Sequence, residues 1–77
     1  MTEPTDNVLE LIRLTHEEAR LVEKLASIHK AKAETYRLES VVNEEYYQNQ
    51  IALGNARQRA SDLYDYRGLL CEYNTTI

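Results

Sequence analysis

The fold is decided by residues 8–28, which read VLELIRLTHEEARLVEKLASI. This segment contains neither proline nor glycine, and many of its leucine and isoleucine residues recur three or four positions apart. Such spacing places side chains on one side of an α-helix, because the helix makes one turn in about 3.6 residues. The segment therefore predicts a long amphipathic helix, with an apolar stripe formed by Leu11, Leu14, Leu21, Leu25 and Ile28.

The apolar pattern continues beyond this segment, as far as Tyr73. Alternate steps of three and four residues from Leu11 visit 18 positions, and 12 of them are apolar if Tyr and Ala are counted, whereas the 43% apolar content predicts about 8. A sustained alternation of this kind is typical of coiled coils. It fails at Lys32, Thr35 and Glu39, where a neighbouring row takes over. A straight helix drifts in this way against a strict seven-residue repeat. The neighbouring row consists of Val22, Ala26, His29, Ala33 and Tyr36.

These patterns predict an all-α fold: a long amphipathic helix with coiled-coil character, in an oligomer or complex. The helix is expected either to be unbroken or to fold back as a hairpin near Gly54. Gly54 is the stronger local signal for a turn, because glycine readily ends a helix in the left-handed conformation. A second candidate lies at residues 40–44, near the middle of the chain, where two β-branched valines precede Asn43.

The chain is expected to form one domain at most. Residues 1–6 read as a polar lead-in, residues 7–73 as the helical domain and residues 74–77 as a polar tail. Asn7 and Glu10 have the spacing of a helix-capping box, which predicts that the helix begins near Asn7. Thr15 and Glu18 have the same spacing, but the leucines keep their phase across Thr15, so we expect one continuous helix there.

Length and composition favour association over catalysis. Ordering 77 residues costs roughly 1.5 kcal/mol each, which a core of this size barely offsets. Cys71 is the only cysteine, which allows at most one intermolecular disulfide, and His16 and His29 stand thirteen residues apart, so the sequence predicts no metal site or cofactor. Since no set of acid, base and nucleophile can be named, we expect a protein that is not an enzyme and has no small-molecule substrate.

Charge and hydropathy exclude two further classes of partner. The net charge of −4 does not favour direct binding of nucleic acid, which normally needs a basic surface. We expect no membrane association either, because no apolar run approaches the roughly 18 residues of a membrane span and the first residues do not resemble a signal peptide. The expected location is cytoplasmic or nuclear.

The aromatic content points to protein contacts. Six tyrosines are present without phenylalanine or tryptophan, and tyrosine suits partly buried helix contacts because its ring is apolar and its hydroxyl polar. The residues expected to bind a protein partner are the apolar positions of both halves of the chain together with two clustered tyrosines. They are Leu11, Leu14, Leu21, Leu25, Ile28, Val42, Tyr46, Leu53, Ala56, Ala60, Leu63, Tyr64, Tyr66 and Leu70.

The sequence therefore predicts a non-enzymatic helical interaction or scaffold subunit, bound to copies of itself or to a larger complex through its leucine, alanine and tyrosine stripes. The alternative is a small acidic regulator or inhibitor, of the kind that a phage or virus encodes, that blocks an enzyme or transcription protein through residues such as Glu17, Glu18, Glu44 and Glu45. The final residues 75–77, Thr-Thr-Ile, also resemble the ligand of a PDZ domain, which captures a carboxyl terminus.

Overall fold

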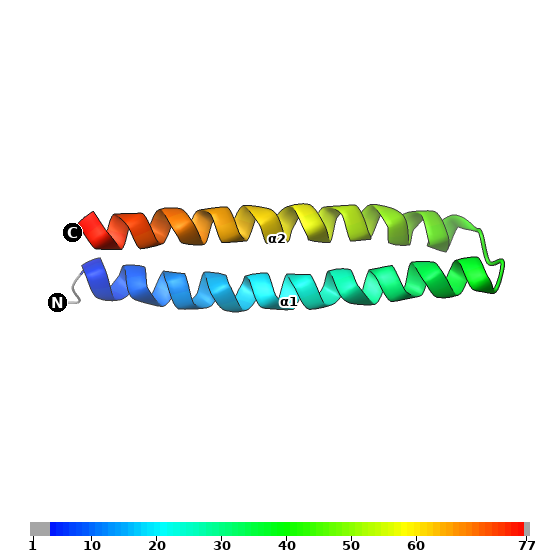
Figure 1. Ribbon diagram of the computed structural model, residues 1–77, viewed down its shortest axis with the longest axis horizontal. Helices are drawn as coiled ribbons and strands as arrows, with labels where there is room; N and C mark the ends of the chain where they lie inside the picture. Colours follow the sequence, from blue (N-terminus) through cyan, green and yellow to red (C-terminus); the bar gives the residue numbers. More distant parts are fainter. Residues whose placement is uncertain (1–3, 77) are drawn as a thin grey trace.

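The protein is a helical hairpin (Figure 1). The computed structural model describes residues 4–76, in which helix α1 spans Pro4–Leu38 and helix α2 spans Glu44–Thr76. The two helices run antiparallel and side by side, so the start of α1 and the end of α2 lie at the same end of the molecule. The hairpin measures 57 × 17 × 15 Å. The all-α expectation is thus confirmed for the described residues.

The bend lies at residues 39–43, the second of the two candidate positions. An unbroken helix and a bend at Gly54 were both wrong, since Gly54 lies inside α2 and has no positive φ. A bend near the middle gives helices of 35 and 33 residues that pack along almost their whole length. A bend at Gly54 would give unequal arms and leave much of the longer arm without a neighbour.

Ser40 ends α1 in the left-handed conformation, with φ of 57°. The Val41 amide donates to the Tyr36 carbonyl at 2.7 Å and the Ser40 amide donates to the Arg37 carbonyl at 3.1 Å. These two bonds form a Schellman motif, which satisfies carbonyls that the end of a helix leaves without partners. A serine therefore occupies a position where glycine is usual.

Asn43 begins α2 as its N-cap residue. Its side-chain Oδ1 accepts a hydrogen bond from the Tyr46 amide at 3.1 Å, and its carbonyl accepts from the Tyr47 amide at 3.2 Å. Glu44 and Glu45 follow in the first turn, where carboxylates interact favourably with the positive end of the helix dipole. The bend is thus specified by a C-terminal motif and an N-terminal cap in direct succession.

The outer limits of the helices differ from expectation. α1 begins at Pro4, so Asn7 lies inside the helix and is not its N-cap residue, and Glu10 accepts hydrogen bonds from Arg13 at 2.6 and 3.1 Å. These bonds lower the pKa of Glu10. α1 continues through Thr15 as expected, and α2 continues through Thr76 into the segment expected to be a tail. Residues 1–3 of the expected lead-in and Ile77 lie outside the described residues.

The interior consists of one row of side chains from each helix, which we call the inner rows. Within each row the steps alternate between three and four residues, and every member is buried or half-buried. Many members are alanine, so the two backbones can approach closely. The inner row of α1 is Val8, Ile12, Thr15, Ala19, Val22, Ala26, His29, Ala33 and Tyr36. The inner row of α2 is Tyr46, Asn49, Leu53, Ala56, Ala60, Leu63, Arg67 and Leu70.

Neither helix has an apolar segment of the length that crossing a membrane requires, as far as residues 4–76 show.

Candidate protein-binding surface

The leucines of α1 lie on the outer surface of the hairpin. Leu11, Leu14, Leu21, Leu25 and Ile28, which we call the leucine row, are between 44% and 58% exposed. From Leu11 to Ile28 the row extends along roughly 26 Å of helix. An exposed apolar row of this length is a candidate interaction surface.

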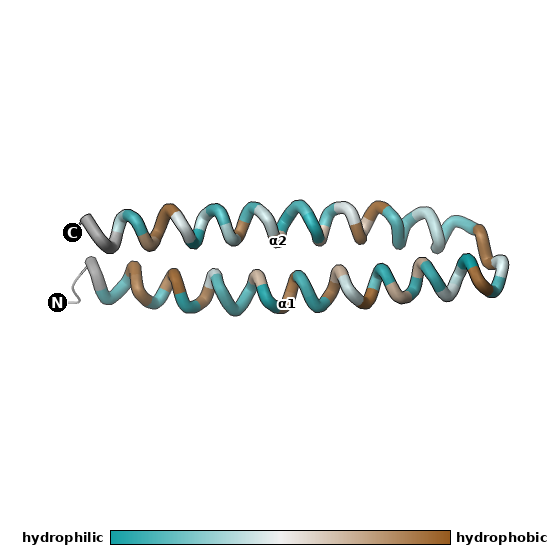
Figure 2. The backbone as a smooth tube through the Cα atoms, viewed as in Figure 1, coloured by the Kyte–Doolittle hydropathy of each residue, from teal (hydrophilic) through white to brown (hydrophobic). Residues whose placement is uncertain are grey.

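The inner row of α1 consists mostly of smaller residues than this outer row, whereas α2 contributes Leu53, Leu63 and Leu70 to the interior. Ala19 is completely buried, and the other buried apolar residues of the hairpin include Ala56 and Ala60. No large side chain among the described residues is buried to below 2% exposure. Figure 2 shows that hydrophobic segments recur along α1 more often than along α2, whose middle is mostly hydrophilic. Contact with α2 thus leaves a substantial part of the apolar surface of α1 uncovered.

The leucine row lies on one broad side of the hairpin, which residues of α2 extend. Glu18, which interrupts the row between Leu14 and Leu21, forms an ion pair with Arg59 of α2 at 3.2 Å, so Arg59 marks the same side on α2. Tyr66 follows Arg59 by seven residues, about two helical turns, and therefore points to this side as well. Leu69, three residues further, is 63% exposed. We call the leucine row with Tyr66 and Leu69 the apolar face.

The opposite side of the hairpin is polar. Arg20, Glu23 and Arg57 lie there, and Tyr64 of α2 faces the Glu23 carboxylate across a shallow hollow between the helices. Hydrogen bonding with Glu23 is the main cause that raises the pKa of Tyr64, because a phenolate cannot donate to a carboxylate. The hairpin as a whole is therefore amphipathic, with one apolar and one charged side.

Two polar contacts between the helices set their alignment. Asn49 of α2 is only 5% exposed and bonds to both the backbone carbonyl and the ring of His29. Nearer the open end of the hairpin, Arg67 donates to Nδ1 of His16 at 2.8 Å, so the proton of a neutral His16 ring lies on Nε2. The Arg67 guanidinium also lies 5.4 Å from the centre of the Tyr64 ring, in reach of a cation–π interaction.

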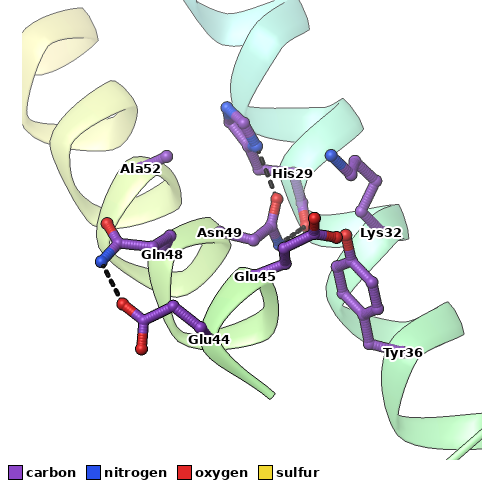
Figure 3. Close-up of a pocket in the computed structure, with 8 residues that line it drawn as sticks. All are labelled: His29, Lys32, Tyr36, Glu44, Glu45, Gln48, Asn49 and Ala52. Carbon is purple, nitrogen blue, oxygen red and sulfur yellow. Dashed lines mark hydrogen bonds between the residues drawn. The ribbon is translucent and has the colours of Figure 1, made fainter. Parts of the chain in front are cut away.

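An open hollow of about 430 Å³ lies between the helices near the bend (Figure 3). Asn49 points across it from α2 toward His29, and Lys32 and Glu45 face it from opposite helices. The amide of Asn49 and the ring of His29 are bonded to each other, so they are not aimed at a ligand. The ring of Tyr36 packs edge-on against Tyr46, with centroids 6.1 Å apart. The arrangement joins the two helices near the bend.

The structure divides the sequence-predicted binding residues into separate groups. The leucine row is exposed on the apolar face, together with Tyr66, whereas Tyr64 points to the polar side. Val42 is 56% exposed in the bend. The remaining residues belong to the inner row of α2, and their neighbour in the structure is α1. They are Tyr46, Leu53, Ala56, Ala60, Leu63 and Leu70.

Sequence reasoning missed several residues that organise this surface. Leu69 was not assigned to binding because it lies off the row that starts at Leu11. Asn49 was counted as a polar interruption of an apolar row. Its signal was available, since a single asparagine in such a row commonly fixes the alignment of two helices. The contact of Asn49 with His29, twenty residues away, required the position of the bend.

Residues 4–76 contain no group of three or more His, Cys, Asp or Glu side chains placed to hold a metal ion. Comparison with protein-family models, with curated proteins and with solved structures gave no match for this chain.

Proposed function

We propose that the protein is a non-enzymatic helical assembly module that binds protein through its apolar face. The observation that carries this proposal is the distribution of apolar side chains on α1, with leucines outside and mainly small residues inside. Burial of a leucine contributes about 1.5 to 3 kcal/mol when it is complete, so covering five half-exposed residues provides a substantial driving force. In the bound form the side chains of the leucine row fit between the side chains of a partner helix, with the knobs-into-holes packing of a coiled coil.

The test is substitution of Leu21 or Leu25 by Asp. Both side chains are about half exposed in the hairpin, so the helix content of the isolated chain, measured by circular dichroism, should change little. Association, measured by light scattering or by binding of a purified partner, should be lost because a carboxylate cannot be buried without a counter-charge. Ile51→Asp is the matched control, because Ile51 is 57% exposed on α2 and lies outside the apolar face. A Leu25→Asp chain that associates as tightly as wild type would refute the proposal.

The acidic residues do not form one surface that would favour the inhibitor alternative. Glu17 is bonded to Arg20 and Glu18 to Arg59 within the hairpin. Glu44 and Glu45 lie near the bend, which is about 30 Å further along α1 at 1.5 Å per residue. The apolar face is therefore the better supported candidate for a binding surface.

A further inference from the structure

We infer that the apolar face is occupied by a second copy of this chain, whose α1 packs antiparallel against the first α1 about a two-fold axis at Leu25. This inference rests on the proposed function, since it names the partner of the same surface. It follows from the order of residues in and beside the leucine row. This surface is complementary in charge and shape to the same surface of a second α1 that runs in the opposite direction.

The side chains around Leu25 form a self-complementary series. Glu18 lies seven residues before Leu25 and Lys32 lies seven residues after it, on the same side of the helix. Leu21 lies four residues before Leu25, and Ile28 lies three residues after it. A two-fold axis at Leu25 therefore brings Leu25 against its own copy, Leu21 to the level of the other Ile28, and Glu18 to the level of the other Lys32.

Charge selects the antiparallel arrangement. Glu18 and Lys32 of opposite copies attract each other at both ends of the contact, whereas a parallel arrangement in register would bring Glu18 against Glu18 and Lys32 against Lys32. Glu18 can take part while it keeps its ion pair with Arg59, because only one of its carboxylate oxygens, Oε2, contacts Arg59.

Shape supports the same alignment. A largely apolar hollow of about 390 Å³ lies on α1 beyond Leu25, lined by Ile28, Ala31, Lys32, Thr35 and Tyr36. Leu14 lies eleven residues before Leu25 and Tyr36 eleven residues after it. The two-fold axis therefore brings Leu14 of the second copy to the level of this hollow. The product is a four-helix assembly in which each hairpin keeps its polar side toward solvent.

The first test exchanges the two charges. Glu18→Lys gives a chain with lysine at both ends of the contact, and Lys32→Glu gives a chain with glutamate at both ends. Each variant alone should dimerise about tenfold more weakly than wild type at low ionic strength, because attraction becomes repulsion at two places. An equimolar mixture should recover dimers, since opposite charges then meet at both ends. Sedimentation equilibrium measures all three samples.

The control for the charge exchange is Glu17→Lys. This substitution changes the net charge by the same amount on the neighbouring residue, but Glu17 lies outside the leucine row and pairs with Arg20. Its dimerisation should stay within about threefold of wild type. If Glu17→Lys weakens dimerisation as much as Glu18→Lys, or if the mixture of the two single variants fails to recover, the antiparallel alignment is wrong.

The second test places a cysteine at the axis. In a Cys71→Ser background, Leu25→Cys should form an intermolecular disulfide readily on mild oxidation, because the two-fold axis brings the two thiols together. Lys24→Cys is the matched control, since it points about 100° away around the helix. Dimers that cross-link equally fast through both positions would overturn the placement of the axis.

These experiments separate the inference from the proposed function. A wild-type chain that stays monomeric at about 100 μM overturns the second-copy inference. If such a monomer still binds another purified protein and loses that binding on Leu25→Asp, the proposed function stands. A dimer that is unaffected by Leu21→Asp and by Leu25→Asp overturns both.

Discussion

Asn49 and His29 form two hydrogen bonds across the interior of the hairpin. Asn49 Nδ2 donates to the His29 backbone carbonyl at 2.9 Å, and Asn49 Oδ1 lies 2.7 Å from Nδ1 of the His29 ring. Because only the amino group of the carboxamide can donate to a carbonyl, Oδ1 must face the ring, and Nδ1 of His29 must carry a proton. A shift of one helical turn between α1 and α2 would break both bonds and leave Asn49 buried among apolar neighbours.

Substitution of Asn49 by Ala should therefore destabilise the hairpin by about 1 to 3 kcal/mol, since it leaves a donor of His29 without its partner. Urea unfolding followed by circular dichroism measures the change. Gln48→Ala is the control, because Gln48 is exposed and bonds to Glu44 on the same helix, and it should cost less than about 0.5 kcal/mol. Equal effects of the two substitutions would show that the buried contact contributes nothing specific.

Replacement of Ser40 by Gly should stabilise the protein. Ser40 has φ of 57°, a conformation that costs a residue with a side chain about 1 kcal/mol relative to glycine. We expect a gain of about 0.5 to 1 kcal/mol in the free energy of unfolding, measured in urea. Ser40→Ala keeps a Cβ atom and should show no such gain. A destabilised Ser40→Gly chain would contradict the left-handed end of α1.

Gly54→Ala should also stabilise the protein, by up to about 1 kcal/mol, because an exposed glycine inside a helix is unfavourable. A Cβ atom at Gly54 meets no other atom within 4 Å, so the substitution introduces no clash. Thermal unfolding provides the measurement. If the chain turned at Gly54, as one reading of the sequence suggested, alanine there would destabilise it instead.

The interaction of Tyr64 with Glu23, which raises the pKa of Tyr64, should make stability depend on pH in the alkaline range. Since the folded state raises the pKa of Tyr64 above its usual 10.0, the stabilisation is present below pH 10 and is lost as pH rises through the pKa of the folded state. Wild type should therefore be more stable than Tyr64→Phe at pH 7, and the difference should shrink above pH 10. Urea unfolding of both chains at several pH values tests this.

Glu23→Ala provides the matched control for the tyrosine experiment. It removes the acceptor while it keeps the Tyr64 hydroxyl, so Tyr64→Phe in the Glu23→Ala background should change stability little at any pH. A pH-dependent difference that persists without Glu23 would assign the effect to another partner of Tyr64.

The helical nature of the chain and much of its apolar patterning could be predicted from sequence, because helix periodicity is a local property. The row through Leu53, Ala56, Ala60 and Leu63 was identified correctly as apolar, and it is the inner row of α2. The continuity of α1 across Thr15 followed from the phase of the leucines. The bend was harder to place, because Gly54 is the residue type that most often ends a helix, whereas it is Ser40 that adopts the left-handed conformation at the end of α1.

The sequence by itself determined that this half of the chain has two apolar rows, the leucine row and the neighbouring row through Val22, Ala26 and Ala33. It could not determine which row meets α2, because periodicity reports that residues share a side and not what lies opposite. The tertiary structure decided this. Small residues such as Ala19, Ala56 and Ala60 let the two helices approach closely, and the Asn49–His29 contact fixes their alignment. The leucine row consequently remains exposed, because α2 is the one other helix of the hairpin and can cover only one side of α1.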